Sequence, residues 1–368
     1  VQTCALPIFG IASMGTAANR IIINGVTDAN GNRPTISGDG ATTASGSMIP
    51  GYAVFGGLQT LGVITLQRRS GRPATEQPSY ITLQNLHVTG AYENAPSFNN
   101  LGVSVPWGNF GCGFWLNASK DVDVINCVAE NNGLGIFTNS QGGGDEYGSE
   151  RINLLYNRIY GNGIVGDAHQ HNVYHQCYDT IVEGNYFGFL RQGAQGSAYK
   201  SRCGKEIFRF NWVEASATIM DMVQADGYFD GMVLKEDYGI SWVYGNVFIT
   251  DEARNGTTAY RMFHFGGDNQ GEQSQDFPQD PSPSNYRMHL YFWNNTIYSN
   301  PTSTGQQYLL KLSYIEQTCD WWNNIVYQPG SRLLHVLHYA GTLNIRGNNL
   351  FYSPTGLDDW APETNGIF

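Results

Sequence analysis

Three consecutive segments between residues 167 and 230 carry the side chains best suited to acid–base chemistry. GDAHQHNVYHQC contains His171 and Tyr174, GSAYKSRC contains Lys200 and Arg202, and ATIMDMVQ contains Asp221. The whole chain of 368 residues has 20 Lys and Arg together, so two of them in one short segment is a local concentration. Lys, Tyr or His can act as a general base or acid, and Arg can bind a carboxylate through paired hydrogen bonds.

The spacing of these segments predicts how their side chains are arranged. An offset of 26 residues superposes the first two segments and places Tyr174 beside Lys200. Alternation along an extended strand then puts Lys200 and Arg202 on one face. Because an unpaired Lys or Arg in an apolar core would be costly, that face should point outward. Asp221, flanked by two methionines, should point outward too, whereas His171 joins the patch only if the chain turns before Tyr174.

Such a patch suits an acidic polysaccharide built from uronate sugars. Arg202 would neutralise the sugar carboxylate and the enolate-like charge that develops when the adjacent carbon loses its proton. Lys200 and Tyr174 are the candidate base and acid, with His171 and Asp221 orienting them, and the reaction would be β-elimination or C5 epimerisation. An ordinary ladder of solvated polar side chains, in which Asp221 only pairs with Arg202, explains the same residues equally well.

Other residues suggest metal, hydrolytic or sugar-stacking sites. A metal cluster would use His169, His171 and His175, although a straight strand carries the last out of reach of the others. Calcium would suit the acidic residues of a Gly-rich loop, Asp145, Glu146 and Glu150. Paired carboxylates for glycoside hydrolysis could come from Asp221, Asp226 and Asp230. The aromatic residues that could stack on sugars, or pack under loops, are Trp107, Tyr228 and Tyr260.

The elements that would position these residues are predicted by an internal repeat. A short apolar run, an Asn and a second apolar run recur nine times, at Asn85, Asn126, Asn157, Asn185, Asn211, Asn246, Asn295, Asn324 and Asn349. The closest two are 25 residues apart, which suits a rung of three short strands, each paired in parallel with the next rung. We therefore predict an all-β fold, a single-stranded right-handed parallel β-helix of nine or ten rungs, and not a β-sandwich.

Each recurrent Asn is expected at a sharp turn. Asn tolerates the left-handed backbone conformation, and stacked amides can hydrogen-bond from rung to rung. Cys177 and Cys203 each stand eight residues before such an Asn, so they should be neighbours on adjacent rungs, and we favour buried thiols over a disulfide. The long steps between repeats mark irregular loops at 91–110, 141–150 and 255–287.

Composition and charge exclude several function classes. The net charge is −11, which argues against nucleic acid as a partner because phosphate binding needs a basic surface. Charged residues make up 14% and aromatic residues 13%, with 45 Gly, a mixture that suits short strands and turns. No apolar run is long enough to span a membrane. We expect a monomer.

The first eight residues, VQTCALPI, match the translation of a sequencing-adapter oligonucleotide. We therefore expect residues 1–8 to be an artefact that replaces the native start. Residues 9–368 are expected to form one β-helix domain, truncated at its N-terminal end.

Several segments resemble a bacterial family of right-handed parallel β-helix repeat proteins. They are RIIINGVTDANGNRPTISGDGA, YITLQNLHVTGA, GLGIFTNS, HNVYHQ and AYKSRC. The resemblance covers most of the chain from about Arg20, and HNVY and KSR are its most specific pieces. This chain departs from the family at Gln170, where Gly is usual, and in IMDMV, where an IDLP-type run is usual and Asp221 holds the acidic position.

The resemblance implies an exported protein, extracellular or periplasmic, whose family lies near polysaccharide lyases of the chondroitinase and alginate lyase type. Those lyases use Lys and Arg on a β-helix face together with calcium, so calcium is the cofactor that the resemblance implies, without assigned ligands here. We expect a lyase-like enzyme acting on acidic polysaccharide. The alternatives are a non-catalytic glycan-binding or adhesin-like surface protein and, third, a glycoside hydrolase. An enzyme needs a site group that titrates near neutral pH, whereas a scaffold does not.

Overall fold

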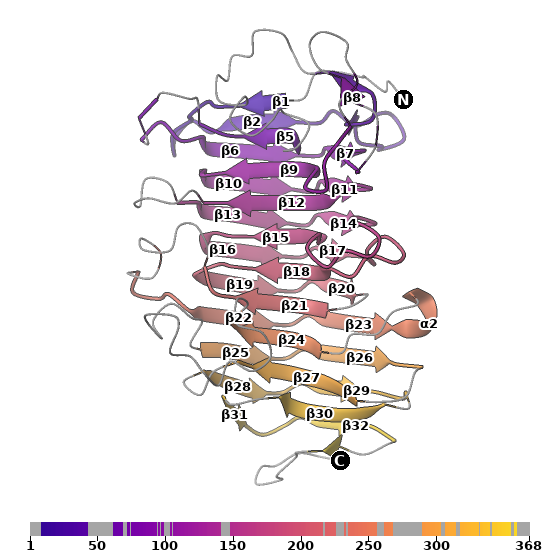
Figure 1. Ribbon diagram of the computed structural model, residues 1–368. Coiled ribbons are helices and arrows are strands. Elements are labelled where there is room, and N and C mark those ends of the chain that lie inside the picture. The colour runs from indigo at the N-terminus through magenta and orange to yellow at the C-terminus, as the bar shows by residue number, and fades with distance from the viewer. Residues whose placement is uncertain are drawn as a thin grey trace.

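Three strands separated by three turns make one rung, and the rungs stack in parallel into a right-handed β-helix (Figure 1). This confirms the predicted fold. The computed structural model describes residues 9–42, 62–68, 72–73, 75–93, 95, 97–98, 104, 106–140, 148–215, 218–225, 232, 235–255, 261–267, 289–302, 306–313, 317–330, 332–338, 341–354 and 357–358. Residues 1–8 lie outside these ranges, so their expected origin stays a prediction.

Each strand of a rung belongs to one of three long sheets that run the length of the β-helix. Sheet 1 contains β1 (Phe9–Ile11), β5 (Gly62–Leu66), β9 (Cys112–Asn117), β12 (Leu134–Asn139), β15 (Val173–His175), β18 (Ser197–Ser201), β21 (Thr218–Val223), β24 (Arg261–Gly266), β27 (Gln306–Leu312), β30 (Leu333–His338) and β33 (Leu357–Asp358). Sheet 2 contains β2 (Ile21–Asn24), β6 (Ser79–Gln84), β10 (Lys120–Ile125), β13 (Glu150–Leu155), β16 (Tyr178–Glu183), β19 (Lys205–Arg209), β22 (Ile240–Tyr244), β25 (His289–Trp293), β28 (Thr318–Trp322) and β31 (Thr342–Ile345). Sheet 3 contains β3 (Thr35–Ser37), β7 (His87–Thr89), β11 (Val128–Glu130), β14 (Arg158–Tyr160), β17 (Tyr186–Phe187), β20 (Trp212–Ala215), β23 (Val247–Asp251), β26 (Thr296–Asn300), β29 (Ile325–Tyr327) and β32 (Leu350–Tyr352). Outside the sheets, β4 (Ala41–Thr42) pairs with β8 (Ser97–Phe98), and α2 (Glu252–Asn255) follows β23.

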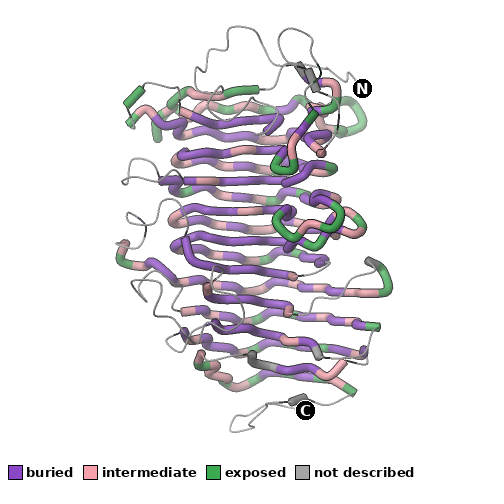
Figure 2. The backbone as a smooth tube through the Cα atoms, in the orientation of Figure 1, coloured by how far each residue is buried: buried purple, intermediate pink, exposed green. Residues whose placement is uncertain are grey.

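The core is a narrow apolar column inside the β-helix, built by the alternation of each strand. On sheet 2, register partners from successive rungs point inward and are buried. They are Leu83, Val124, Leu154, Val182, Phe208, Val243, Phe292 and Trp321. The buried segments in Figure 2 follow the strands of every central rung. Because the interior is filled mainly by apolar side chains, most ionisable residues of the strands are directed to the outer faces. His175 and Glu206 are buried exceptions, and both are hydrogen-bonded.

A buried asparagine ladder joins the rungs at the turn between sheets 2 and 3. It runs through Asn157, Asn185, Asn211, Asn246, Asn295, Asn324 and Asn349. From Asn185 onward, each side-chain oxygen accepts a hydrogen bond from the backbone N–H of the preceding ladder asparagine, at 2.8–3.0 Å. The predicted rung-to-rung hydrogen bonding of amides is confirmed from Asn157 to Asn324, where side-chain nitrogens donate to the next side-chain oxygen at 2.9–3.2 Å.

The left-handed conformation falls one residue earlier than expected. At these turns the residue before the ladder asparagine has positive φ, as at Tyr156, Gly184 and Phe210. Asn85 and Asn126 are themselves left-handed; Asn85 is half-buried and Asn126 is exposed. Their place in the repeat was therefore wrong by one residue: the backbone N–H of Cys127, not of Asn126, donates to Asn157.

Several smaller expectations are also settled. The cysteines at 177 and 203 are buried free thiols, as expected. Trp107 is buried and donates a hydrogen bond to the Gly38 carbonyl oxygen at 2.9 Å, so it packs under a loop. Tyr228 and Tyr260 lie outside the described residues. No helix in the part of the chain that the structure describes is long and apolar enough to cross a membrane.

Candidate functional site

A column of register partners on the outer face of sheet 1 brings the predicted residues together. Phe137 on β12 pairs with Tyr174 on β15, which pairs with Lys200 on β18. Lys200 pairs with Asp221 on β21, and Asp221 with His264 on β24. Parallel strands lie roughly 4.8 Å apart, so each side chain touches its neighbours along the axis. The predicted pairing of Tyr174 with Lys200 and the outward direction of Asp221 agree with this register.

Arg202 holds the hydroxyl of Tyr174. Its Nε donates a hydrogen bond to Tyr174 Oη at 2.6 Å, and its Nη1 donates to the Gln224 carbonyl oxygen at 2.9 Å. The guanidinium therefore lies fixed between two rungs with its positive charge beside the phenol oxygen. That hydrogen bond fixes the position of the phenol oxygen within the site.

Lys200, Asp221, His264 and Ser313 form one hydrogen-bonded chain across four rungs. Lys200 Nζ lies 2.8 Å from Asp221 Oδ2, and His264 Nδ1 lies 2.6 Å from Asp221 Oδ1. On its other side, His264 Nε2 lies 2.8 Å from Ser313 Oγ. Asp221 thus pairs with Lys200 and His264. The alternative of a solvated polar ladder predicted that Asp221 would pair with Arg202 instead.

The two buried groups in the middle of this hydrogen-bonded chain, Asp221 and His264, both have lowered pKa values. Burial alone would raise the pKa of Asp221, but Lys200 and the hydrogen bond from His264 outweigh it and hold that pKa well below its usual range. Burial lowers the pKa of His264 to about 4, although Asp221 opposes the shift. At neutral pH Asp221 is therefore a carboxylate and His264 is neutral.

The lowered pKa of His264 predicts an acid-sensitive fold. An unfolded His takes up its proton near pH 6.5, whereas folded His264 does so only near 4. Between these values the unfolded chain binds more protons, so stability falls as pH falls, by about 3 kcal/mol for this group. Urea unfolding at both ends of the window measures the loss. His264→Gln keeps a side-chain hydrogen bond but should show a smaller pH-dependent loss, and an unchanged slope would contradict this assignment.

The chain turns between His171 and β15, and this turn brings His171 into the site. The spacing allowed His171 to join the patch only with such a turn. Its ring lies against Tyr174 edge to face, with centroids 5.6 Å apart. The backbone N–H of Ser197 donates to His171 Nδ1 at 2.8 Å, so the neutral ring carries its proton on Nε2 and is a donor there. Gly196 allows β18 to approach this turn closely, because a Cβ at that position would collide with the Gln170 carbonyl oxygen.

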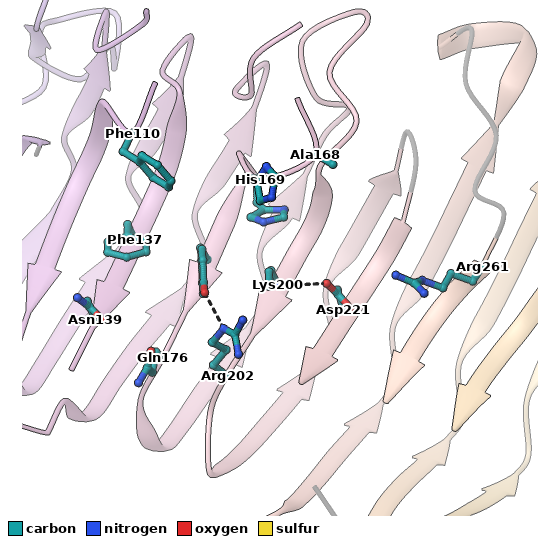
Figure 3. A pocket seen from close by; sticks show the side chains of 12 residues that line it. Phe110, Phe137, Asn139, Ala168, His169, Gln176, Lys200, Arg202, Asp221 and Arg261 are labelled. Carbon is teal, nitrogen blue, oxygen red and sulfur yellow. Dashed lines mark hydrogen bonds and ion pairs between the residues drawn. The ribbon is translucent and has the colours of Figure 1, made fainter. Parts of the chain in front are cut away.

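These residues line an open cavity of about 700 Å³ on the outside of sheet 1 (Figure 3). Its walls are Phe110, Phe137, Asn139, Ala168, His169, His171, Tyr174, Gln176, Lys200, Arg202, Asp221 and Arg261. Three of them are cations and one is a carboxylate, in a protein of net charge −11. The cavity is therefore a local cationic site on an acidic molecule, which suits an anionic ligand.

The predicted outward patch is far less exposed than expected. Exposed fractions are 7% for Lys200, 5% for Arg202, 7% for Asp221 and 3% for His171. The side chains point away from the core, as alternation requires, but neighbouring rungs and turns cover them. Their charges are thus paired in a poorly solvated setting, where each interaction is stronger than on an open surface.

Sequence reasoning missed Arg261 and His264, which lie on β24 beyond a loop. Arg261 lines the cavity, and it makes no ion pair with any residue that the structure describes. A signal for His264 was present: it is a single ionisable residue inside an apolar run, MFHFG, just as Asp221 is in IMDMV. Lys311 has the same setting in YLLKL, and it is the register partner of His264 on β27.

The predicted histidine cluster does not assemble, and the two acidic sites lie mostly outside the described residues. His175 points inward, where Thr138 and Thr180 hydroxyls lie 2.9 Å from its ring nitrogens, so it shares no metal site with His171. Glu150 is engaged by Lys120, Arg151 and Lys235. The remaining acidic candidates, Asp145, Glu146, Asp226 and Asp230, lie outside the described residues. Among the residues described, no cluster of three or more His, Cys, Asp or Glu could hold a metal ion.

No family model matches the chain, and no curated protein sequence matches it. Among solved structures, an alginate lyase from Paenibacillus sp. str. FPU-7 is similar with 13% identity and a TM-score of 0.41. The match covers 94% of this chain and 88% of that chain. Similarity at this level carries no argument about the chemistry of the cavity.

Proposed function

We propose that the cavity binds a uronate-containing polysaccharide and cleaves it by β-elimination. The observation that carries the proposal is the Arg202–Tyr174 pair, a tyrosine hydroxyl held by a guanidinium inside a cationic cavity. Cations can bind the sugar carboxylate, and the tyrosine oxygen is the group placed to exchange a proton. Because such polymers occur outside cells, we also propose that the protein is exported.

In β-elimination a base removes the proton on C5, next to the carboxylate. The electron pair left on C5 is first delocalised into the carboxylate as an enolate, then forms the C4=C5 double bond as the C4–O4 bond breaks. The leaving oxygen O4 takes a proton from an acid. The cavity must therefore neutralise the carboxylate and supply both proton transfers.

Tyr174 is the group we assign to the proton transfers. Acting as a base through its oxygen, which lies 2.6 Å from Arg202 Nε, it takes the C5 proton and can return it to O4. Lys200 is disfavoured as the base, because its Nζ is already paired with Asp221 Oδ2 at 2.8 Å. Lys200 and Arg261 instead bind the carboxylate, and His171 donates from Nε2. From sequence, Lys200 and Tyr174 were expected to share the base and acid roles and Arg202 to bind the carboxylate. Here Tyr174 takes both proton transfers, and Arg202 positions its hydroxyl.

Calcium does not fit this cavity. The one carboxylate in its walls, Asp221, is already paired with Lys200 and His264. Calcium requires six to eight oxygen ligands, and three neighbouring cations would repel it. We therefore predict that a calcium chelator leaves the cleavage rate within about twofold. Rates measured with chelator and with added calcium check this; a loss that calcium restores would show that a calcium site outside the described residues is required.

The reaction type is tested by the mass of the oligosaccharide products. Elimination gives a new unsaturated end, so each such product weighs one water less than the product of hydrolysis. A glycoside hydrolase gives the hydrated mass, and a C5 epimerase gives no new chain ends. Mass spectrometry after incubation with alginate, pectate, chondroitin, hyaluronan and heparin separates the three, and hydrated products would overturn the proposal.

One observation favours a second candidate, a non-catalytic glycan-binding protein. Lys200 is neutralised by Asp221 and His171 Nδ1 is occupied by a backbone N–H, so the cavity has few groups able to accept a proton. Such a protein would bind an acidic polysaccharide and leave it intact. Binding without new chain ends in any of the five polymers would establish this function instead.

A further inference from the structure

The outer face of sheet 1 changes character along the β-helix axis. Toward the C-terminal rungs its column carries charged and polar groups, beginning with Lys200. Toward the N-terminal rungs the register partners are Tyr174, Phe137 and Trp115. The Phe137 ring lies 5.1 Å from Tyr174 and 4.4 Å from Trp115, centroid to centroid. Phe110, 41% exposed, adds a further ring to the same end of the cavity (Figure 3).

A second column beside the aromatic rings consists of neutral amides. Asn117 and Asn139 are register partners on β9 and β12. Gln67 and Gln176 stand two residues after register partners of the aromatic column, so they continue the amide column on neighbouring rungs. Next in this column, one rung beyond Gln176, stands Arg202. The change from neutral to cationic therefore occurs at the same rung in both columns.

Gln176 has an unused hydrogen-bond donor directed at the cavity. Its side chain lines the cavity and is 3% exposed, yet Nε2 has no hydrogen-bond partner among the described residues. Buried polar groups are nearly always paired, because leaving one unpaired costs free energy. A ligand hydroxyl or carbonyl oxygen that accepts this bond would remove the cost. The same column holds another unpartnered atom, Asn117 Oδ1.

We propose that the cavity is built for a polysaccharide in which an acidic sugar alternates with a neutral one, such as a uronate–N-acetylhexosamine polymer. This rests on the proposed function and names its substrate class. The acidic sugar lies at Lys200 and Arg261, and the neutral sugar lies between Phe137 and Gln176. Those two subsites are separated by about two rungs, roughly 10 Å.

Charge, as well as the shape of the cavity, favours a polymer in which acidic and neutral sugars alternate. Aromatic faces stack on the apolar face of a sugar ring, and amides bind its hydroxyl or acetamido groups. Neither can neutralise a carboxylate. A uronate homopolymer would place a second carboxylate against Phe137 and Gln176. The nearest cation, Arg202, is already engaged by Tyr174 and the Gln224 carbonyl oxygen, so the cost of desolvating that carboxylate is poorly compensated. The neutral half of the cavity therefore discriminates against homopolymers.

Calorimetric binding of size-matched oligosaccharides tests this assignment. The measurement uses the full chain carrying Tyr174→Phe, so that the ligand is not consumed. Hyaluronan and chondroitin oligosaccharides should bind at least tenfold tighter than oligogalacturonate or oligomannuronate. Adding Gln176→Leu should weaken hyaluronan binding tenfold or more. The matched control is Gln77→Leu, at a glutamine equally buried and unpartnered that lies outside this cavity, and it should not change binding.

Equal affinity for homopolymer and alternating polymer would overturn the inference, as would equal effects of the two glutamine substitutions or the absence of binding to every polymer. The proposed elimination is tested separately from the substrate class. If wild-type protein cleaves homopolymers as readily as alternating polymers, the elimination holds and the substrate class is wrong. If the alternating polymer binds as predicted but is never cleaved by wild-type protein, the substrate class holds and the elimination is wrong.

Discussion

Tyr174→Phe should lower the rate of polysaccharide cleavage by about 10²–10⁴-fold, the range for removing a general acid–base group. The substitution deletes only the hydroxyl that accepts from Arg202 Nε. The ring keeps its contacts with Phe137 and His171, so the fold and the aromatic end of the cavity remain. The loss should appear in kcat with little change in KM. Initial rates with the preferred polymer measure it.

Tyr156→Phe is the matched control for this substitution. Tyr156 is 55% exposed and its hydroxyl donates to Glu183 Oε1 at 2.7 Å, at a turn outside the cavity. It should leave the cleavage rate within about twofold. If both variants retain wild-type rates, Tyr174 has no role in the proton transfers, and a different group must take the C5 proton.

Asp221→Ala should destabilise the folded protein by about 3–5 kcal/mol, the cost of leaving a buried charge without its partner. Lys200 would remain as a cation of 7% exposure, close to Arg202 and Arg261. Replacing both members, Lys200→Met with Asp221→Leu, should restore most of the lost stability, because it removes the uncompensated charge. Urea unfolding of the three variants measures the difference.

The control is an ion pair of the same type on the surface. Glu76→Ala breaks the pair with Arg72, whose Nε lies 3.3 Å from Glu76 Oε2 and whose members are both well exposed. It should cost less than about 1 kcal/mol. If Asp221→Ala cost no more than Glu76→Ala, the Lys200–Asp221 pair would be solvated, and Lys200 would again be a candidate base.

Local periodicity predicted the part of the site that lies on consecutive short rungs. The 26-residue offset was enough to place Tyr174 beside Lys200, since only turns of ordinary length separate β15 from β18. Alternation was enough to direct Lys200 and Asp221 away from the core. It said nothing of their solvent exposure, because burial on an outer face depends on turns and neighbouring rungs that are not periodic.

Residues beyond the long insertions were not predicted. His264 stands 43 residues after Asp221, although the two residues lie on adjacent rungs. Because the inserted residues make this step much longer than an ordinary rung, the register of His264 with Asp221 could not be predicted from spacing. The asparagine motif failed in a different way. Asn85 and Asn126 occupy the left-handed position of the turn, whereas Asn157 occupies the ladder position next to it. One residue type satisfies both positions, so composition alone could not distinguish them.

The central claim, elimination on a uronate polymer, is tested most directly by ultraviolet absorbance during incubation of wild-type protein with the five polysaccharides. A C4=C5 double bond conjugated to the carboxylate absorbs where the intact polymers do not. The account predicts a rising signal with at least one uronate polymer, steepest with an alternating one and lost in Tyr174→Phe. A flat trace with every polymer, from protein shown to be folded and to bind one of them, would contradict it.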